Sequence, residues 1–284
     1  MIPLQSGDGL FLMGHGTKSL VGQQQFLQLV SKAKNSFHLP VSGGFIELAE
    51  PDMSAALETI ITTEHLKRLV IIPVVLFPAG HMKDDGPNLT RLAKKLGGRD
   101  LEVIYTSHLG LLPEILSVLE ERITEAMALS TTDTADPTGV LLVGRGSSDP
   151  DGNAEMYKAM RLLIERSSSD FSAIQPAFVS LALPTVPQGL DILRRLGYSK
   201  IVIQPFFLFH GTLIDRMFEQ AKSWASTVDE APTIMRGQAI GPHSHLLQAI
   251  EFRLQEGLGN TVRTSCDLCI YRTPTIRTAE RVGY

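Results

Sequence analysis

The sequence predicts an α/β fold of two homologous lobes, each a four-stranded parallel sheet flanked by helices, with an active-site cleft between the lobes. Short, almost continuous apolar runs alternate with longer segments that have the periodicity of amphipathic helices. This alternation is typical of parallel sheets covered by helices on both faces. An internal repeat with a spacing of about 130 residues indicates that the whole pattern occurs twice.

The elements of the first half follow in the order strand then helix, four times over. The predicted strands are LFLM (10–13), VSGGFIELA (41–49), RLVIIPVVLF (68–77) and LEVIYTS (101–107). The predicted helices are one with Phe26, Leu29, Val30 and Ala33 on a single face, and then 53–61, 89–96 and 113–127. Ligands of such sheets bind outside the carboxyl ends of the strands, so the polar residues that follow each strand are the candidates for function.

The second half repeats this pattern at nearly constant spacing, 130 to 133 residues later. The matched positions are Gly14 with Gly144, FIELAEP (45–51) with FVSLALP (178–184), Pro73 with Pro205, Gly110 with Gly241, and Arg122 with Arg253. The predicted domains are an N-terminal lobe with the catalytic histidines (1–129), a polar linker (130–138), a degenerate C-terminal lobe (139–256) and a tail (257–284).

A Gly-x-Gly turn follows the first strand of each half. Its central residue is His15 in the first half and Arg145 in the second. Glycines permit a tight turn and a close approach to a ligand, and a helix that begins there offers N–H groups to an anion. Taken alone, this turn is weak evidence, because a histidine in an ordinary loop has the same appearance.

Two further polar residues of the first half lie at the same predicted edge. Glu47 lies within the apolar run FIELA, where a buried carboxylate would need a partner, and its counterpart is Ser180. His81 lies in a predicted glycine-bearing loop (78–87), and its counterpart is Leu213. Two imidazoles and one carboxylate suit the binding of a divalent transition metal or proton transfer near neutral pH. Three ligands with open positions suit a metal that is handled transiently.

The other histidines carry weaker signals. His38, His65 and His108 have no visible partner, which favours structural roles. His210 follows the third strand of the second half, three positions away from the match to His81. The stretch His243-Ser244-His245 has the spacing of a metal clip, but it opens a predicted helix, which favours capping or a surface role.

Composition narrows the class of protein. The chain has 284 residues, 43% of them hydrophobic, and a formal net charge of −4, which argues against a broad nucleic-acid surface. No run approaches the ~18 uninterrupted apolar residues of a membrane helix, and no signal peptide is recognisable. The two cysteines exclude a disulfide framework. We therefore expect a cytoplasmic protein with neither nucleic acid nor membrane as a partner.

The motifs LFLMGHGTKS, GFIELAEP, IPVVLFPAGHMKDDGP and CDLCIYR, together with the degenerate second copy, resemble the long form of class II chelatases of the CbiX and SirB type. The resemblance covers nearly the whole chain. It implies insertion of Co2+ or Fe2+ into sirohydrochlorin, for cobalamin or sirohaem biosynthesis, with the macrocycle in the cleft between two chelatase lobes. It also implies that His15 and His81 handle the metal, with Glu47 as a third participant, and that catalysis requires no cofactor beyond the substrate metal.

The carboxylate rim of sirohydrochlorin calls for cations and N–H donors around the cleft. The expected substrate-binding residues are Arg145 and Arg216, with the backbones of Gly14, Gly16 and Gly80. Lys18 and Lys83 are further candidates for contacts with this rim, but a solvated surface position is the expectation for both lysines. Arg145 has the alternative of pairing with Asp149.

Cys266 and Cys269 form a C-x-x-C pair beyond both lobes. In long chelatases the corresponding pair belongs to an iron-sulfur cluster, but such clusters are normally held by four cysteines. The pair is therefore read in three ways: a cluster shared between two protomers of a homodimer, which we favour, a thiol couple, or no cluster.

Two other functions compete with metal insertion. A histidine phosphatase would have an arginine where Gly14 stands, so that class fits poorly. A carrier that binds a tetrapyrrole or metal without turnover would keep the same cleft and histidines, and the sequence does not separate it from a chelatase.

Overall fold

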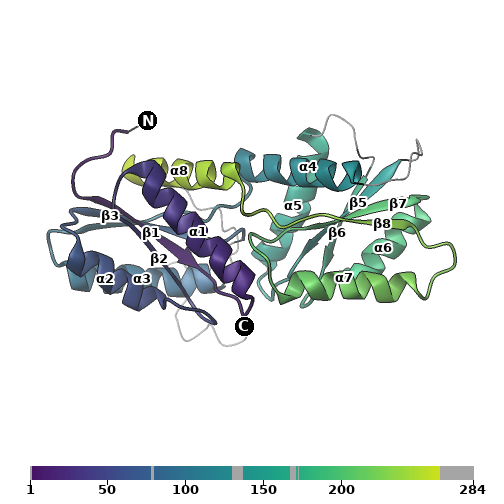
Figure 1. Cartoon of the computed structure of the whole chain (residues 1–284), viewed down its shortest axis with the longest axis horizontal. Coiled ribbons are helices and arrows are strands. Elements are labelled where there is room, and N and C mark those ends of the chain that lie inside the picture. The colour runs from purple at the N-terminus through teal and green to yellow at the C-terminus, as the bar shows by residue number, and fades with distance from the viewer. Residues whose placement is uncertain (1, 78–79, 130–136, 167–170, 172, 263–284) are drawn as a thin grey trace, which may run out of the picture.

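The computed structural model of the chain describes residues 2–77, 80–129, 137–166, 171 and 173–262, and for residues 80–82 it describes the backbone alone. These residues form two separate four-stranded parallel sheets, with the strand orders β2-β1-β3-β4 and β6-β5-β7-β8. Figure 1 shows the two sheets side by side along the long axis, each with its helices. The predicted fold of two homologous α/β lobes is confirmed.

The first half of the chain contains β1 (Asp8–Gly14), α1 (Leu20–Phe37), β2 (Val41–Phe45), α2 (Met53–Thr63), β3 (Arg68–Val74), α3 (Gly80–Gly97), β4 (Glu102–Tyr105) and α4 (Pro113–Ala128). The second half contains β5 (Thr138–Gly144), α5 (Pro150–Arg166), β6 (Ala173–Phe178), α6 (Val186–Arg195), β7 (Lys200–Pro205), α7 (Thr212–Ala225), β8 (Thr233–Arg236) and α8 (Ser244–Leu258). None of the described helices combines the length and the apolar character that a membrane span needs.

The repeat read from the sequence holds at the level of strand register. Met13 lies opposite Pro73 in the first sheet, and Val143 lies opposite Pro205 in the second. Strand β3 is therefore aligned with β1 at the same offset as β7 with β5, as expected for a duplicated unit. Equivalent loops must then leave the two sheets at equivalent places.

The last helix of each half covers the sheet of the other half. Helix α4 contacts β7, β8 and α5 of the second lobe, whereas α8 contacts β3, β4 and α1 of the first. Accordingly, α8 lies over the first lobe and α4 over the second in Figure 1. The two helices, called the exchanged helices below, also pack against each other. The sequence repeats are thus contiguous along the chain but interlocked in space.

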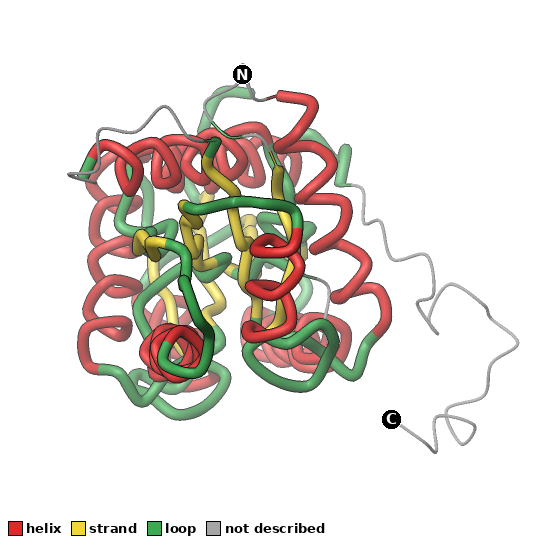
Figure 2. Tube along the Cα trace, turned by 90° about the vertical axis from the view of Figure 1, so that its right-hand side faces the viewer, coloured by secondary structure: helices red, strands yellow, loops and turns green. Residues whose placement is uncertain are grey.

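The position of the apolar sheet faces explains why α4 and α8 each cover the sheet of the other half. Leu10 and Leu12 of β1 point to one face of the first sheet, and they belong to a single buried cluster that also contains Val140 and Leu142 of β5. The exchanged helices supply buried residues to this cluster. The opposite face of each sheet has a cluster of its own. Seen from the end of the second lobe, the strands are enclosed by helices on both faces (Figure 2).

Helix α3 begins earlier than the sequence suggested. The segment 78–87 was expected to be a loop, but α3 starts at Gly80 and passes through Pro87. Leu89 and Ala93 of this helix are buried in the core. A side chain at Gly86 would overlap the Tyr105 ring, so the glycine allows helix and strand to approach closely. Packing of this face outweighs the low helix propensity of glycine and proline.

Candidate functional site

The loop after β1 rests directly on the loop after β2. The backbone N–H of Glu47 donates to the carbonyl oxygen of His15 at 3.1 Å. Gly16 has a φ of +98°, and a Cβ atom there would overlap the carbonyl oxygen of Glu47. A glycine is therefore required at position 16 both for its left-handed backbone and for the close approach. This contact places His15 and Glu47 side by side.

Glu47 is exposed, contrary to the expectation from the sequence. Strand β2 ends at Phe45, and the chain then turns through Leu48, which has a φ of +65°. This turn carries the carboxylate out of the apolar run, and the Glu47 side chain is 48% exposed. Its partner is nevertheless close, because Oε1 of Glu47 lies 3.8 Å from Nε2 of His15.

The two ring nitrogens of His15 have different neighbours. Its Nδ1 lies 3.2 Å from the carbonyl oxygen of Gly16, which can only accept, so Nδ1 carries the proton. The lone pair then resides on Nε2, on the side of Glu47. Ligands ~2.1 Å from a tetrahedral metal lie ~3.4 Å apart, close to the separation of Nε2 and Oε1. These two atoms can hold a divalent ion or pass a proton.

His81 belongs to the first turn of α3 by its backbone, one residue after Gly80, and its side chain lies outside the described residues. Strand β1 lies between β2 and β3, so the segments that follow these strands are neighbours at one edge of the sheet. The sheet order therefore puts Glu47 on one side of His15 and the start of α3 on the other. That both imidazoles meet on one ion stays a prediction, as does the cleft that this segment would line.

Lys83 is an ion-pair residue between the lobes and not the solvated surface lysine that we expected. Its Nζ donates to the carboxylates of Asp149 at 2.6 Å and Asp151 at 3.1 Å, and its side chain is only 12% exposed. Burial lowers the pKa of Lys83, but the two hydrogen bonds and the negative charges outweigh burial and hold the pKa above its ordinary value. We call this trio the inter-lobe clasp. It joins the start of α3 to the loop after β5.

Arg145 occupies the position of His15 in the second lobe. The N–H of Ser180 donates to the Arg145 carbonyl oxygen at 3.0 Å, as Glu47 does to His15, and Gly146 repeats the positive φ of Gly16 at +84°. The Arg145 side chain is exposed and makes no hydrogen bond or ion pair with any described residue. Since Asp149 is held by Lys83, the alternative Arg145–Asp149 pair does not form.

The carboxyl ends of both sheets meet at the boundary between the lobes. Nδ1 of His210, after β7, lies 3.2 Å from the Ser19 hydroxyl, and the His210 N–H donates to Gln25 at 2.9 Å. The loop after β1 therefore contacts the second lobe, as the clasp makes α3 contact the loop after β5. Arg216 lies on the exposed side of α7, without a hydrogen bond or ion pair to the described residues.

The sequence analysis missed Asp151 and named Asp149 only as an alternative partner of Arg145. Both follow the first strand of the second half, so the rule that selected Arg145 would have included them. Their partner Lys83, however, stands 66 residues before Asp149 and 68 before Asp151, and no local pattern reveals it. Cys266 and Cys269 lie outside the described residues.

Known proteins share the sequence pattern and the fold of this chain. A family model described as CbiX matches residues 9–126 and again residues 139–257. The sirohydrochlorin cobaltochelatase of Priestia megaterium is 31% identical over 265 residues, 93% of this chain and 84% of that protein. The sirohydrochlorin ferrochelatase of the same organism is 26% identical over 250 residues, 87% of this chain and 90% of that protein. The solved structure of SirB from Bacillus subtilis with Fe3+ has a TM-score of 0.73 at 22% identity, over 89% of this chain and 96% of that one, and shows the shared fold.

Proposed function

The chain belongs to the CbiX family, and on that premise we propose that it is a chelatase, a lyase that inserts Co2+ or Fe2+ into sirohydrochlorin in cobalamin or sirohaem biosynthesis. The observation that carries the proposal is the pairing of His15 Nε2 with Glu47 Oε1 at 3.8 Å on the carboxyl edge of the first sheet. The metal ion is a substrate of this reaction, and no other cofactor takes part in it.

Metalation of a free-base tetrapyrrole requires three operations: removing water from the ion, delivering the ion to one face of the ring, and accepting two pyrrole protons. The lone pair on Nε2 of His15 can replace one water ligand of the ion. The same nitrogen can accept a pyrrole proton after the metal leaves, because the ordinary pKa of imidazole, about 6.5, is close to neutral pH. Glu47 offsets part of the charge of the ion and can accept the other proton. We assign His81 the role of a second metal ligand.

The second lobe supplies binding and not chemistry. In place of His15 it presents the Arg145 guanidinium, which can bind a macrocycle carboxylate through two parallel hydrogen bonds, and Arg216 is assigned to the same rim. We assign the backbones of Gly14, Gly16 and Gly80 to substrate binding as well. Four leucines in and next to the same loops are exposed and suit the apolar faces of the ring: Leu20, Leu48, Leu181 and Leu183.

We propose that both Co2+ and Fe2+ are substrates. One relative is named a cobaltochelatase and another a ferrochelatase, and Fe2+ and Co2+ are neighbours in the Irving–Williams order with similar preferences for imidazole and carboxylate. Competition between the two ions at equal free concentration measures the preference of this chain.

The direct test mixes purified protein with sirohydrochlorin and either Co2+ or Fe2+ without oxygen and follows the absorbance of the macrocycle. A chelatase accelerates metalation over the spontaneous rate and turns over many times. The alternative, a carrier of the tetrapyrrole or of the metal, changes the absorbance by no more than one equivalent of bound ligand. No acceleration by either metal would reject the chelatase proposal.

The tail residues Cys266 and Cys269 are assigned to an iron-sulfur cluster shared by two protomers, because two thiols are half of the usual set of four. The chain would then be a homodimer. Iron and sulfide analysis of protein purified without oxygen, together with its mass in solution, tests this assignment, and metal-free monomers would refute it. The cytoplasmic location also stays a proposal.

A further inference from the structure

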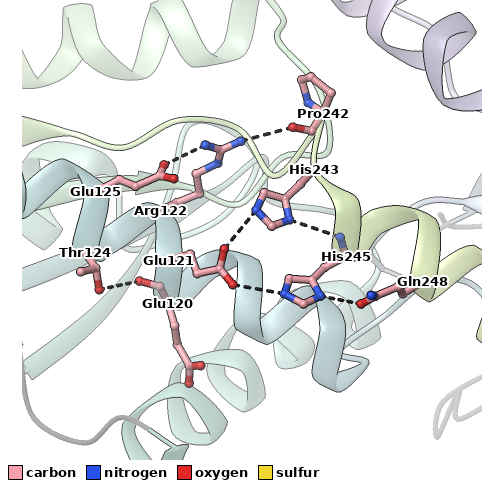
Figure 3. Close-up of polar contacts among 9 residues, drawn as sticks. All are labelled: Glu120, Glu121, Arg122, Thr124, Glu125, Pro242, His243, His245 and Gln248. Carbon is pink, nitrogen blue, oxygen red and sulfur yellow. Dashed lines mark hydrogen bonds and ion pairs between the residues drawn. The ribbon is translucent and has the colours of Figure 1, made fainter. Parts of the chain in front are cut away.

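A second group of metal-ligating side chains lies at the junction of the exchanged helices, on side chains to which the proposed reaction assigns no role. Glu121 on α4 faces His243 and His245 at the start of α8 (Figure 3). Nε2 of His243 lies 3.0 Å from one carboxylate oxygen of Glu121, and Nε2 of His245 lies 3.2 Å from the other. The imidazole rings are stacked, with centroids 5.2 Å apart. We call Glu121, His243 and His245 the junction trio.

The separations within the junction trio are those of a metal site. Two imidazole nitrogens and one carboxylate oxygen around a tetrahedral Zn2+, with bonds of ~2.1 Å, lie ~3.4 Å apart. The two nitrogen–oxygen separations, each to a different carboxylate oxygen of Glu121, are within a few tenths of an ångström of that value, and one ligand atom from each of the three residues lies within 4.8 Å of the other two. A small inward rotation of the two rings completes three ligands. The exposed side of the trio leaves the fourth position to water.

The contacts of His245 suit a metal ligand. Its Nδ1 lies 2.6 Å from Oε1 of Gln248, and its Nε2 lies 3.2 Å from a carboxylate oxygen of Glu121. The contact with Gln248 also resembles the outer hydrogen bond that fixes the tautomer of a metal-bound histidine.

His243 caps α8, as the sequence predicts, and its ring is also placed to bind an ion. Its Nδ1 accepts the backbone N–H of His245 at 3.3 Å, which makes it the N-cap of α8 and leaves the ring proton on Nε2, directed at Glu121. Binding of an ion by Nε2 moves this proton to Nδ1 and releases the capping hydrogen bond. At 3.3 Å this capping hydrogen bond is long and therefore weak, so its loss costs little.

We propose that Glu121, His243 and His245 bind one borderline divalent transition-metal ion of the Zn2+ type, which staples α4 to α8. Imidazole and carboxylate are the ligands that such ions prefer. Since α4 covers the second lobe and α8 the first, an ion at this place ties together the two halves of the chain at their interlocked helices. The site has a structural role and is independent of the proposed insertion of metal into a macrocycle.

The test measures Zn2+ binding to the full-length chain by titration calorimetry, in a background with His15→Ala, His81→Ala, Cys266→Ser and Cys269→Ser. This background removes the other predicted ligands. It is expected to bind one equivalent of Zn2+ and to unfold at a higher temperature when the ion is present, because the ion binds the folded chain. Adding Glu121→Gln or His245→Ala abolishes both effects. Gln248→Ala weakens Zn2+ binding by about tenfold, as is usual when an outer hydrogen bond to a ligand is lost.

The matched control is Glu125→Gln, which removes the same charge one turn later on α4, where the carboxylate pairs with Arg122 at 2.7 Å. It should leave Zn2+ binding unchanged. In the otherwise unmodified chain, Glu121→Gln should bind one equivalent fewer than Glu125→Gln, while metal insertion into sirohydrochlorin proceeds at the same rate in both. Equal binding by these two variants would overturn the proposal and leave the trio as a hydrogen-bonded helix junction.

Discussion

At the scale of single residues, His15 and Arg145 occupy the same position in the two copies of a duplicated turn. Both follow the first strand of a sheet, both accept the same backbone hydrogen bond at the carbonyl oxygen, and both precede a glycine with positive φ. The backbone is therefore maintained by contacts that do not involve the central side chain. That side chain is free to be an imidazole in one lobe and a guanidinium in the other.

His15→Ala is expected to lower the rate of metal insertion by about 100-fold or more, since it removes a ligand and a proton acceptor together. The absorbance assay with sirohydrochlorin measures the rate, and circular dichroism confirms that the variant stays folded. His81→Ala should behave alike. His65, which is exposed, provides the control, and His65→Ala should keep full activity. A normal rate in the His81 variant would show that its assignment is wrong.

His108 is buried, with 4% of its surface exposed, which agrees with the structural role expected for it. Burial first, and then the charges of Arg253 and Lys158, lower the pKa of His108 to about 3. Below the unfolded pKa of about 6.5 the unfolded chain binds a proton that the folded chain does not, so stability is lost as the pH falls. Between pH 6.5 and 5 the unfolding free energy should decrease by up to ~1.4 kcal/mol per pH unit through this group. Urea titrations of the unmodified chain and of His108→Gln measure it, and identical pH slopes would contradict this origin.

At the scale of elements, the two halves hold each other by equivalent contacts. Arg122 on α4 pairs with Glu125 at 2.7 Å and donates to the Pro242 carbonyl oxygen at 3.4 Å, just before α8. Its repeat counterpart Arg253 on α8 pairs with Glu256 at 2.5 Å and donates to the Leu109 carbonyl oxygen at 3.3 Å, before α4. Each exchanged helix thus binds the segment that leads into the other, which fixes the position of α4 against α8.

Removing the inter-lobe clasp should lower the free energy of unfolding, because the clasp joins α3 to the second lobe. Lys83→Met would remove the ammonium group that pairs with the carboxylates of Asp149 and Asp151 in a largely buried place. Loss of one partner from a buried ion pair costs ~3 kcal/mol, and because the same turn of α3 carries His81, activity should fall as well. Chemical denaturation gives the stability and the absorbance assay gives the rate. Lys158→Met is the control, because Lys158 is 54% exposed and pairs with Glu155 at the surface, where the expected loss is below ~0.5 kcal/mol.

At the scale of the whole molecule, one apolar cluster crosses from the first sheet to the second through the exchanged helices. Neither half can then keep its sheet covered when the other unfolds, because one helix that covers it belongs to the other half. The two lobes should therefore unfold together, although each has the topology of a complete α/β unit.

Leu119→Ala on α4 tests this coupling. Leu119 is fully buried, so the substitution should cost ~2–5 kcal/mol. Calorimetry should show one unfolding transition for the unmodified chain and one transition at lower temperature for the variant. Leu129→Ala, at the exposed end of α4, should leave the transition in place. Two transitions, of which only one moves, would show that the lobes unfold independently.

The sequence by itself determined the topology of each lobe and the equivalence of its two halves. Both depend on local information: apolar runs of strand length, helical periodicity, and turns whose glycines are required by the backbone, as at Gly16 and Gly146. For the same reason the sequence found the position shared by His15 and Arg145. It was wrong about the burial of Glu47, because the end of a strand inside an apolar run depends on the turn that follows.

Only the tertiary structure decided which helix covers which sheet and which distant side chains meet. Lys83 is 66 residues away from Asp149, and Glu121 is 124 residues away from His245. Contacts between residues so far apart in the sequence depend on how the lobes pack. Packing is driven by the burial of apolar surface, which is non-directional, so the local sequence does not specify which elements meet. The local pattern of α4 or α8 does not indicate which of the two sheets the helix covers. The interlocking of α4 and α8 joins the two adjacent repeats through one apolar cluster and brings Glu121 to His243 and His245.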